Sequence, residues 1–412
     1  MGSTLTTWSN MLKARYTKEK VQNLTEADRP LLSMLRKDTE QQGSSLEIPL
    51  IHVNPQGIAG SGISRAQTSQ TSLVAKKFSA TCGDYFGSVY IGDKVIKASR
   101  GNPGAFLENK VAETDGLHEQ MSDNLAIYAW GNGGGALGKR ASISTNVVTL
   151  AEPADTLNFE EGMFVVASAN DGSDASHALR AGAGTTVASV QRDAGTVTLV
   201  SAAAITDFAN ADFVFRAGDF FGDTGVTVMK GVQAFIPSAN PTTTLWGMTR
   251  TGDPQRLAGC RVASADYSAK TIDERIRVLG SYMSGRYKTP GATAGFLHPE
   301  DWTTLETVMG ARGIRPLADQ NTKFGFMKID VVMGGRVVSI YPDRYCPKGT
   351  FFALRLQNWW LSSMGPLLSP MEEDGLVLLR AADSMEYEYR LVSYPILACN
   401  APGYNGRVPL TG

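Results

Sequence analysis

Residues 46–131 constrain the fold more than any other part of the chain. A polar, glycine-rich ribbon from Leu46 to Arg100 leads into one long helix, which is expected to end at the glycine cluster 131–135. Strand-like alternation occurs at Leu46–Leu50 and again at Phe86–Ile91. An isolated two-stranded arm is marginal in water, and a long ordered loop is unusual unless something holds it. The simplest remedy is a second copy of the chain, so the ribbon predicts a structural protein that assembles.

Composition excludes several classes of protein. The 412 residues are enough for two or three domains, and a content of 42% hydrophobic and 19% charged residues indicates a globular chain. The net charge of −1 argues against a dedicated nucleic-acid binder. Four widely spaced cysteines without a CxxC motif favour free thiols in a reducing compartment. No apolar run approaches the length of a membrane span, so no membrane partner is expected.

The N-terminal third is predicted to contain an arm and a long helix. Residues 1–42 read as the arm, with a short helix around Thr25–Lys37. The long helix is expected over 102–131, with Asn102 as its N-cap and Pro103 in its first position. Steps of three and four residues mark one buried face, which comprises Leu107, Val111, Thr114, His118, Met121, Leu125 and Tyr128.

Residues 141–218 are rich in alanine, valine, threonine and glycine, and predict a small inserted β-barrel or sandwich. A hairpin is expected at Asp193-Ala194-Gly195 and an exposed loop tip at 171–174. The expected strands are Ile143–Leu150, Met163–Ala169, Thr185–Gln191, Thr196–Val200 and Phe213–Arg216.

The C-terminal half is predicted to mix helices and strands. Residues 220–320 contain a capping box at Thr271–Glu274, and a second helix begins at His298. Residues 321–412 read mainly as strands. In the segment Met385–Leu397, an alternating pattern predicts Tyr387, Tyr389 and Leu391 facing inward and Glu386, Glu388 and Arg390 facing outward.

No motif predicts catalysis, a metal site or a cofactor, and the chain is not expected to be an enzyme. Residues 133–140 nearly spell a phosphate-binding loop, but Arg140 stands where a hydroxyl is needed, and the segment follows a helix instead of a strand. A flexible hinge is the favoured interpretation. The histidines His52, His118, His177 and His298 are far apart, and Asp171 and Asp174 lack the spacing of a calcium loop.

Six basic residues are candidates for contacts between subunits. Lys76 and Lys77 are expected near the ribbon tip, where they would either meet carboxylates of a neighbour or guard against edge-to-edge aggregation. Arg100, Arg250 and Arg256 are candidates because arginine is favoured at interfaces, as is the neighbouring Arg261. The sequence does not choose among them.

The order of elements resembles the major capsid proteins of tailed bacteriophages, whose fold is shared with herpesvirus capsid floors and encapsulin shells. Four segments are similar to stretches of the axial domain or its entry: Gly231–Pro237, Leu245–Arg250, Asp253–Leu257, and Thr293–Pro299 with Trp302 and Leu305. The resemblance implies an α+β fold with an N-terminal arm at 1–42, an extended β-hairpin loop at 43–101, a spine helix of the peripheral domain at 102–131, a β-rich insertion at 141–218, an axial domain at 220–320, and peripheral-domain strands with the C-terminus at 321–412.

The resemblance also implies a function. The chain would form pentamers and hexamers of an icosahedral head shell, with a portal at one vertex and double-stranded DNA packaged inside without sequence-specific binding. It would be found in the virion after assembly in the host cytoplasm. An arm that starts almost at Met1 leaves no room for a long N-terminal scaffolding segment, so the resemblance implies either a separate scaffolding protein or assembly without one. Whether decoration proteins bind the shell stays open. Cross-links from Lys76 or Lys77 to Asn358 or Asn400 also stay open.

Two alternatives remain. One is an encapsulin-like compartment shell, which shares the fold. The other is a tail or baseplate protein that binds carbohydrate through the β-rich insert.

Overall fold

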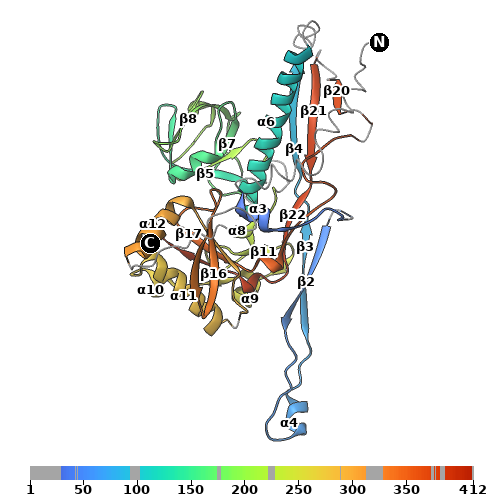
Figure 1. Ribbon diagram of the computed structural model, residues 1–412, viewed down its shortest axis with the longest axis vertical. Helices are drawn as coiled ribbons and strands as arrows, with labels where there is room; N and C mark the ends of the chain where they lie inside the picture. Colours follow the sequence, from blue (N-terminus) through green and yellow to red (C-terminus); the bar gives the residue numbers. More distant parts are fainter. Residues whose placement is uncertain are drawn as a thin grey trace. The chain divides into compact units, whose positions relative to one another are not determined.

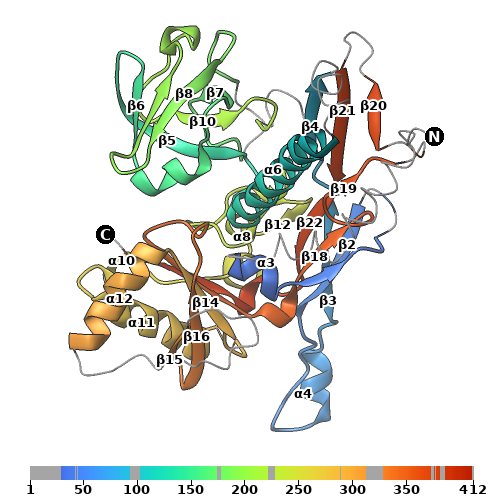
Figure 2. The same ribbon diagram turned by 45° about the horizontal axis from the view of Figure 1, so that its top comes forward.

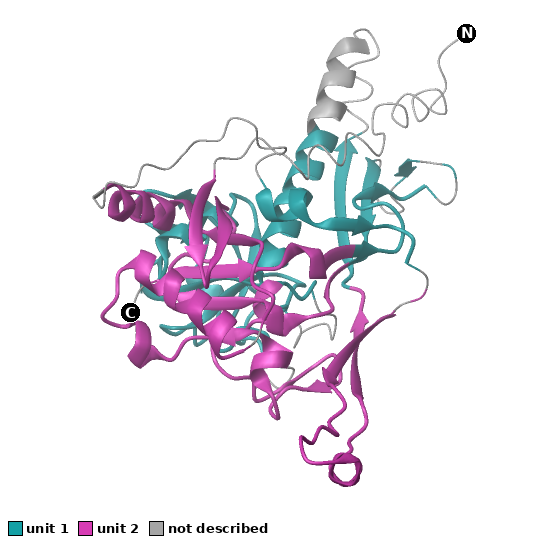
Figure 3. Cartoon of the chain, turned by 60° about the horizontal axis from the view of Figure 1, so that its bottom comes forward, with its two compact units in different colours: residues 1–42, 83–231, 362–395 teal, residues 43–82, 232–361, 396–412 magenta. Residues whose placement is uncertain are grey.

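The computed structural model describes residues 29–410 except 42, 44, 93–102, 174–177, 221–227, 288, 312–327, 373, 374, 376 and 381–385, and not the side chains of 103–112 and 311 (Figure 1). The chain divides into two compact units, coloured separately in Figure 3. Unit 1 comprises residues 1–42, 83–231 and 362–395, and unit 2 comprises 43–82, 232–361 and 396–412. Both units combine helices with strands, which confirms the expected α+β class.

Unit 1 is built around the long helix α6, Pro103–Trp130, which starts and ends where the sequence predicts. The predicted face is buried at Thr114, His118, Met121, Leu125 and Tyr128. Asn102 and the side chains of Leu107 and Val111 lie outside the described residues. Unit 1 also contains α3 (Pro30–Met34), β1 (Arg36–Asp38), β4 (Tyr85–Gly92), β19 (Ser369–Pro370), β20 (Leu378–Arg380) and β21 (Glu386–Ser393).

A small antiparallel sheet packs on α6. Strand β4 pairs with β21 along its whole length, and both run beside the helix in Figure 1. The contact is close at Gly87, where a Cβ would lie 2.4 Å from the sulfur of Met121. The Tyr85 hydroxyl donates to the carbonyl of Met121 at 3.0 Å. Glycine at position 87 therefore lets the strand approach the helix.

The insertion is a closed barrel, one of the two architectures expected from the sequence, with strand order β10-β5-β6-β9-β8-β7 (Figure 2). Its interior contains Leu137, Val148, Phe159, Val165 and Val197. The strands are β5 (Ala136–Ser144), β6 (Val147–Leu150), β7 (Phe164–Ser168), β8 (Thr185–Gln191), β9 (Thr196–Leu199) and β10 (Phe213–Arg216), with 3-10 turns η2 (Pro153–Asn158) and η3 (Ala202–Ala204).

The prediction of one strand over Ile143–Leu150 was wrong. The chain turns at Thr145, whose φ of 54° is left-handed, and β5 and β6 form a hairpin around it. The hairpin predicted at Asp193-Ala194-Gly195 is confirmed between β8 and β9, with Gly195 at a φ of 66°. Glycine adopts this conformation without strain from a side chain.

Unit 2 contains a six-stranded sheet of order β13-β23-β17-β14-β16-β15. Helix α11 begins with the predicted capping box of Thr271 and Glu274, and His298 Nδ1 accepts from the amide of Glu300 at the start of α12. The bounds are β13 (Cys260–Arg261), β14 (Ala294–Leu297), β15 (Ile329–Met333), β16 (Arg336–Pro342), β17 (Thr350–Leu354), β23 (Gly406–Pro409), α9 (Pro254–Ala258), α10 (Ser264–Tyr267), α11 (Ile272–Gly285) and α12 (Pro299–Ala311). The sheet thus joins strands from the segments 220–320 and 321–412.

The extended hairpin belongs to unit 2 and consists of β2, Ser45–Val53, paired antiparallel with β3, Val74–Thr81. The loop between them carries the short helix α4, Ile63–Thr68. The other described elements are α8 (Val232–Phe235), β11 (Thr244–Leu245), β12 (Met248–Thr249), η4 (Leu356–Asn358), β18 (Trp359–Ser363), β22 (Pro395–Cys399) and η5 (Pro402–Tyr404).

The extent of the ribbon was predicted incorrectly. Its second strand is β3, whereas the expected second strand, Phe86–Ile91, is β4 in unit 1. The segment of β3 was not predicted as a strand, yet its Phe78 lies opposite Ile48 and both side chains are buried. Lys76 and Lys77 consequently lie within β3 and not at the tip.

Three further predictions need correction. The helix expected around Thr25–Lys37 ends earlier than predicted, since α3 stops at Met34 and Leu35 is already extended, while residues 25–28 lie outside the described residues. The strand Met385–Leu397 splits into β21 and β22 at Pro395, which has no amide hydrogen to continue a ladder. Glu388 was expected to face solvent but is only 6% exposed, since Arg390 donates to its carboxylate at 2.6 Å.

Candidate functional site

The base of the extended hairpin is anchored in unit 2 by aromatic packing. Phe78 on β3 is fully buried, and its ring meets those of Phe235 and Trp246 edge-on, at centroid distances of 5.9 and 6.5 Å. Ile48 and Ala80 are buried on the same face. Sequence reasoning missed this anchor, although the alternation of Phe78 and Ala80 with polar neighbours was a usable signal.

A polar contact strengthens the anchor further along β2. The Arg256 Nη1 donates to the carbonyl of His52 at 2.8 Å. Arg256 is held in place by Asp253, which caps α9 by accepting from the Arg256 amide and also pairs with its guanidinium at 3.5 Å. Burial lowers the pKa of His52, and the charge of Lys76 lowers it further. Arg256 therefore contacts the hairpin of its own chain.

Beyond this anchor, the hairpin is uncovered. None of residues 54–73 is buried, and the side chains of Ile58 and Ile63 are 88% and 76% exposed. The loop closes on itself through main-chain and side-chain bonds between Gln56 and Thr71, both at 2.9 Å. Arg65 is the one charged residue in this segment of the sequence. We call residues 54–73 the hairpin tip.

The two lysines have different surroundings. Lys77 pairs across the strands with Glu47 at 2.8 Å, and this hydrogen bond, followed by one from Ser79, lowers the pKa of Glu47. Lys76 is half-buried opposite Leu50. An exposed pair such as Lys77 with Glu47 contributes little to stability, but it satisfies Lys77 within its own chain.

The candidate arginines are not brought together. Arg250 is 4% exposed and donates to the carbonyl of Ala234 at 2.8 Å. Burial, followed by the charge of Arg261, lowers the pKa of Arg250 to about 10. Arg261 donates to the carbonyl of Ala258 at 2.8 Å within the same unit. Arg100 lies outside the described residues.

The glycine cluster that resembles a phosphate loop is tightly packed. A Cβ on Gly134 would lie 2.0 Å from the carbonyl oxygen of Asp171, and one on Gly135 would lie 2.6 Å from that of Asp219. Asn132 adds a 2.8 Å hydrogen bond to the Asp171 carboxylate. The backbones cross closely here, so the segment that was expected to be a flexible hinge is tightly packed in this structure.

The histidines and cysteines of the described residues do not gather into a metal site. They include no group of three or more histidine, cysteine or acidic side chains that could hold a metal ion. His118 contacts Tyr389 in the core of unit 1, and burial raises the pKa of Cys260 and of Cys399 to about 12. Such thiols are unreactive at neutral pH. Among the described helices, none is both long and apolar enough to cross a membrane.

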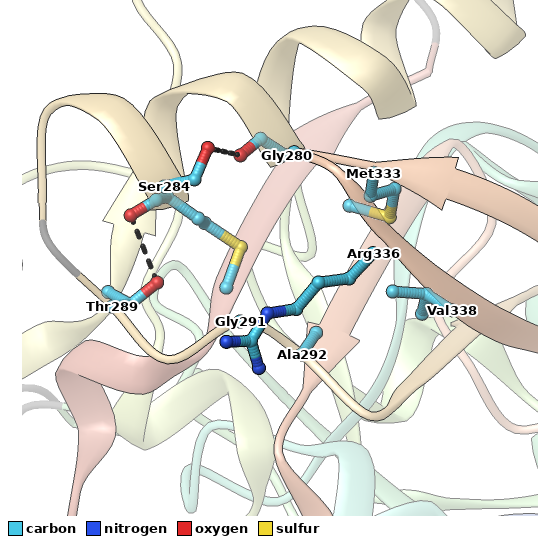
Figure 4. A pocket seen from close by; sticks show the side chains of 10 residues that line it. Gly280, Ser284, Thr289, Gly291, Ala292, Met333, Arg336 and Val338 are labelled. Carbon is cyan, nitrogen blue, oxygen red and sulfur yellow. Dashed lines mark hydrogen bonds between the residues drawn. The ribbon is translucent and has the colours of Figure 1, made fainter.

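A small pocket in unit 2 lies beside α11 and the β15–β16 hairpin (Figure 4). Its hydroxyl groups already bond to the chain: Ser284 donates to Gly280 and Thr289 to Met283, both at 3.0 Å. Gly280 and Gly334 form its wall by close backbone approach. The exposed Arg336 is its one charged residue, so the pocket has no convergent polar groups for a ligand.

Asn358 and Asn400 lie together in unit 2. The amide of Asn358 donates to the side-chain oxygen of Asn400 at 2.6 Å. Their cross-linking to a lysine of another copy stays a prediction.

No protein-family profile and no curated protein matches the chain. Among solved structures, it is similar to a chain of the cyanophage A-1(L) capsid asymmetric unit, at 12% identity and a TM-score of 0.47, covering 93% of both chains. It is similar to the capsid of an empty GTA particle at 9% identity and a TM-score of 0.47, covering 94% of this chain and 91% of that one. The holo-SrpI encapsulin complex from Synechococcus elongatus PCC 7942 gives 9% identity and a TM-score of 0.42, covering 94% and 89%.

Proposed function

We propose that the chain is the self-assembling subunit of a closed protein shell, the major capsid protein of a tailed-bacteriophage head. The observation that carries this proposal is the hairpin tip. Its base is fixed by Phe78, yet the tip exposes Ile58 and Ile63 and buries nothing against its own chain. A rigidly anchored arm with an apolar end is suited to reach another molecule.

The free energy of burying the exposed isoleucines favours association between copies of the chain. Full burial of an isoleucine side chain contributes about 1.5–3 kcal/mol, so two from each copy give a substantial contact. In a closed shell every subunit both gives and receives this contact, and closed symmetry makes such contacts cooperative. The hairpin tip of one copy therefore lies across an adjacent copy, and pentamers and hexamers are the expected assemblies.

The charge of the chain suits a container. A net charge of −1 gives no large basic surface to bind packaged DNA tightly. DNA is therefore enclosed without sequence-specific contacts. A portal at one vertex and separate scaffolding and decoration proteins complete this proposal, with the shell as part of the virion. Lys76 and Arg256 remain proposed contact residues at the root of the hairpin.

Negative-stain microscopy of the purified protein, combined with analytical ultracentrifugation, tests the proposal. The expected result is closed particles of uniform size from the wild type. Rings or trimers would instead favour a tail or baseplate protein, and a monodisperse monomer under all assembly conditions would refute the proposal.

A charged tip variant isolates the role of the hairpin. Ile58→Asp with Ile63→Asp should leave a folded subunit that assembles at least tenfold less. Val337→Asp on β16 is the matched control, because Val337 is also an exposed aliphatic side chain, at 66%. Equal loss of assembly in both variants would show that the tip has no special role.

A further inference from the structure

Four adjacent strands of the barrel share an outer face without charge. Phe164 on β7 lies opposite Thr186 on β8, and the amide of Val200, just after β9, donates to the carbonyl of Thr186 at 2.9 Å. Two residues before Val200, Thr198 on β9 lies opposite Val147 on β6. The side chains between these, at Val165, Val187, Val197 and Leu199, point into the barrel and are buried.

The face is apolar at its centre and charged only at its margins. Phe164, Val200 and Val147 are 44%, 62% and 37% exposed. Charged side chains appear beyond the strand ends, where Glu160 and Arg192 pair at 2.7 Å and Asp193 occupies the β8–β9 turn. Depletion of charge at the centre with a polar rim is the composition of a protein–protein interface.

The size of the face indicates what covers it. Four strands at about 4.8 Å spacing, each about five residues of 3.3 Å, give a patch on the order of 300 Å². A stable complex between free partners needs about 800 Å² on each side. A separate protein held by this face alone would dissociate. A second copy that the shell already holds nearby would not, because its effective concentration is high.

We propose that this face contacts the same face of a second copy of the chain, across a twofold axis of the assembled shell. This inference rests on the proposed function and extends it to the barrel. An uncharged surface of threonine and valine can meet itself without placing like charges together, which a twofold interface requires. Paired barrels therefore join subunits in addition to the hairpin tip.

Cysteine cross-linking of assembled particles tests the contact. In a full-length Cys82→Ser background, Val147→Cys, Thr198→Cys and Val200→Cys are introduced singly, and particles are oxidised with copper phenanthroline. A disulfide forms where two Cβ atoms lie about 3.5–4.5 Å apart. At least one variant should give a covalent dimer on a non-reducing gel in particles but not in dilute subunits. Ser142→Cys, exposed on β5, is the control and should stay monomeric.

A charge variant supplies an independent measurement. Thr198→Lys places like charges on both sides of the axis, and particles should dissociate at a several-fold lower urea concentration while unfolding of the free subunit is unchanged. Ser142→Lys should behave as wild type. If Thr198→Lys particles are as stable as wild type and no cysteine variant gives a cross-linked dimer, the proposed contact between barrels is wrong. That result would not affect the proposal that the chain forms a shell. Absence of particles from the wild type overturns both.

Discussion

The imidazole Nε2 of His118 lies 3.1 Å from the hydroxyl oxygen of Tyr389, and both side chains are fully buried. The two residues are 271 positions apart in the sequence. His118 comes from α6 and Tyr389 from β21, so this contact ties the long helix to a C-terminal strand of unit 1. The sequence predicted both as inward-facing, but not that they meet.

Removing the Tyr389 hydroxyl should destabilise the subunit. Tyr389→Phe keeps the ring and takes a hydrogen-bond partner from a buried histidine, which costs about 1–3 kcal/mol. Urea unfolding of the unassembled subunit measures the loss. Tyr404→Phe is the control, because Tyr404 is 40% exposed and should change stability by less than about 0.5 kcal/mol. Equal effects of the two changes would contradict the structural role of the pair.

The hairpin should separate stability from assembly. Phe78→Ala removes a fully buried ring at the base and should cost about 3–5 kcal/mol of unfolding free energy. Ile58→Ala removes a side chain that is 88% exposed and should leave unfolding almost unchanged while weakening assembly. Thermal unfolding of subunits and particle yield by ultracentrifugation measure the two effects. A large stability loss in Ile58→Ala would show that the tip packs on its own chain.

Two glycines should respond oppositely to alanine. At Gly134 an added Cβ would lie 2.0 Å from the Asp171 carbonyl oxygen, so Gly134→Ala forces backbone movement and should destabilise by more than about 2 kcal/mol. At Gly116, exposed in α6, an added Cβ meets no atom within 4 Å. Gly116→Ala should stabilise by about 0.5–1 kcal/mol. Calorimetric melting temperatures of the two variants test both signs.

Stability should depend on pH through Asp155. Burial, followed by the charge of Glu152, raises the pKa of Asp155 from 3.8 to about 7. Between these values the native protein keeps a proton that the unfolded chain releases, so this carboxyl lowers stability as the pH rises through that window.

Asp155→Asn should therefore be more stable than wild type at pH 8, by a few kcal/mol at most, since one pKa unit corresponds to about 1.4 kcal/mol. The difference should vanish near pH 4. Urea unfolding across pH 4–8 measures it, with the exposed Glu161→Gln as control. A wild-type and variant difference that is independent of pH would contradict the shifted titration.

Elements with local signals could be predicted from the amino-acid sequence. The three- and four-residue steps located the buried face of α6, the capping residues located the start of α11, and alternation with a turn signal located the β8–β9 hairpin. Each depends on residues within one or two turns of one another, where spacing alone fixes which side chains share a face.

Strand pairing and side-chain burial depend on contacts between segments that are distant in the sequence. The sequence suggested Leu46–Leu50 and Phe86–Ile91 as the two strands of the ribbon, yet β2 pairs with β3 while β4 pairs with β21, far along the chain. Burial of Arg250 likewise depends on a partner from another segment, the carbonyl of Ala234. Two strands pair when their contact buries apolar side chains from distant segments. The free energy of that burial exists only in the folded chain, so no local stretch of sequence reveals it.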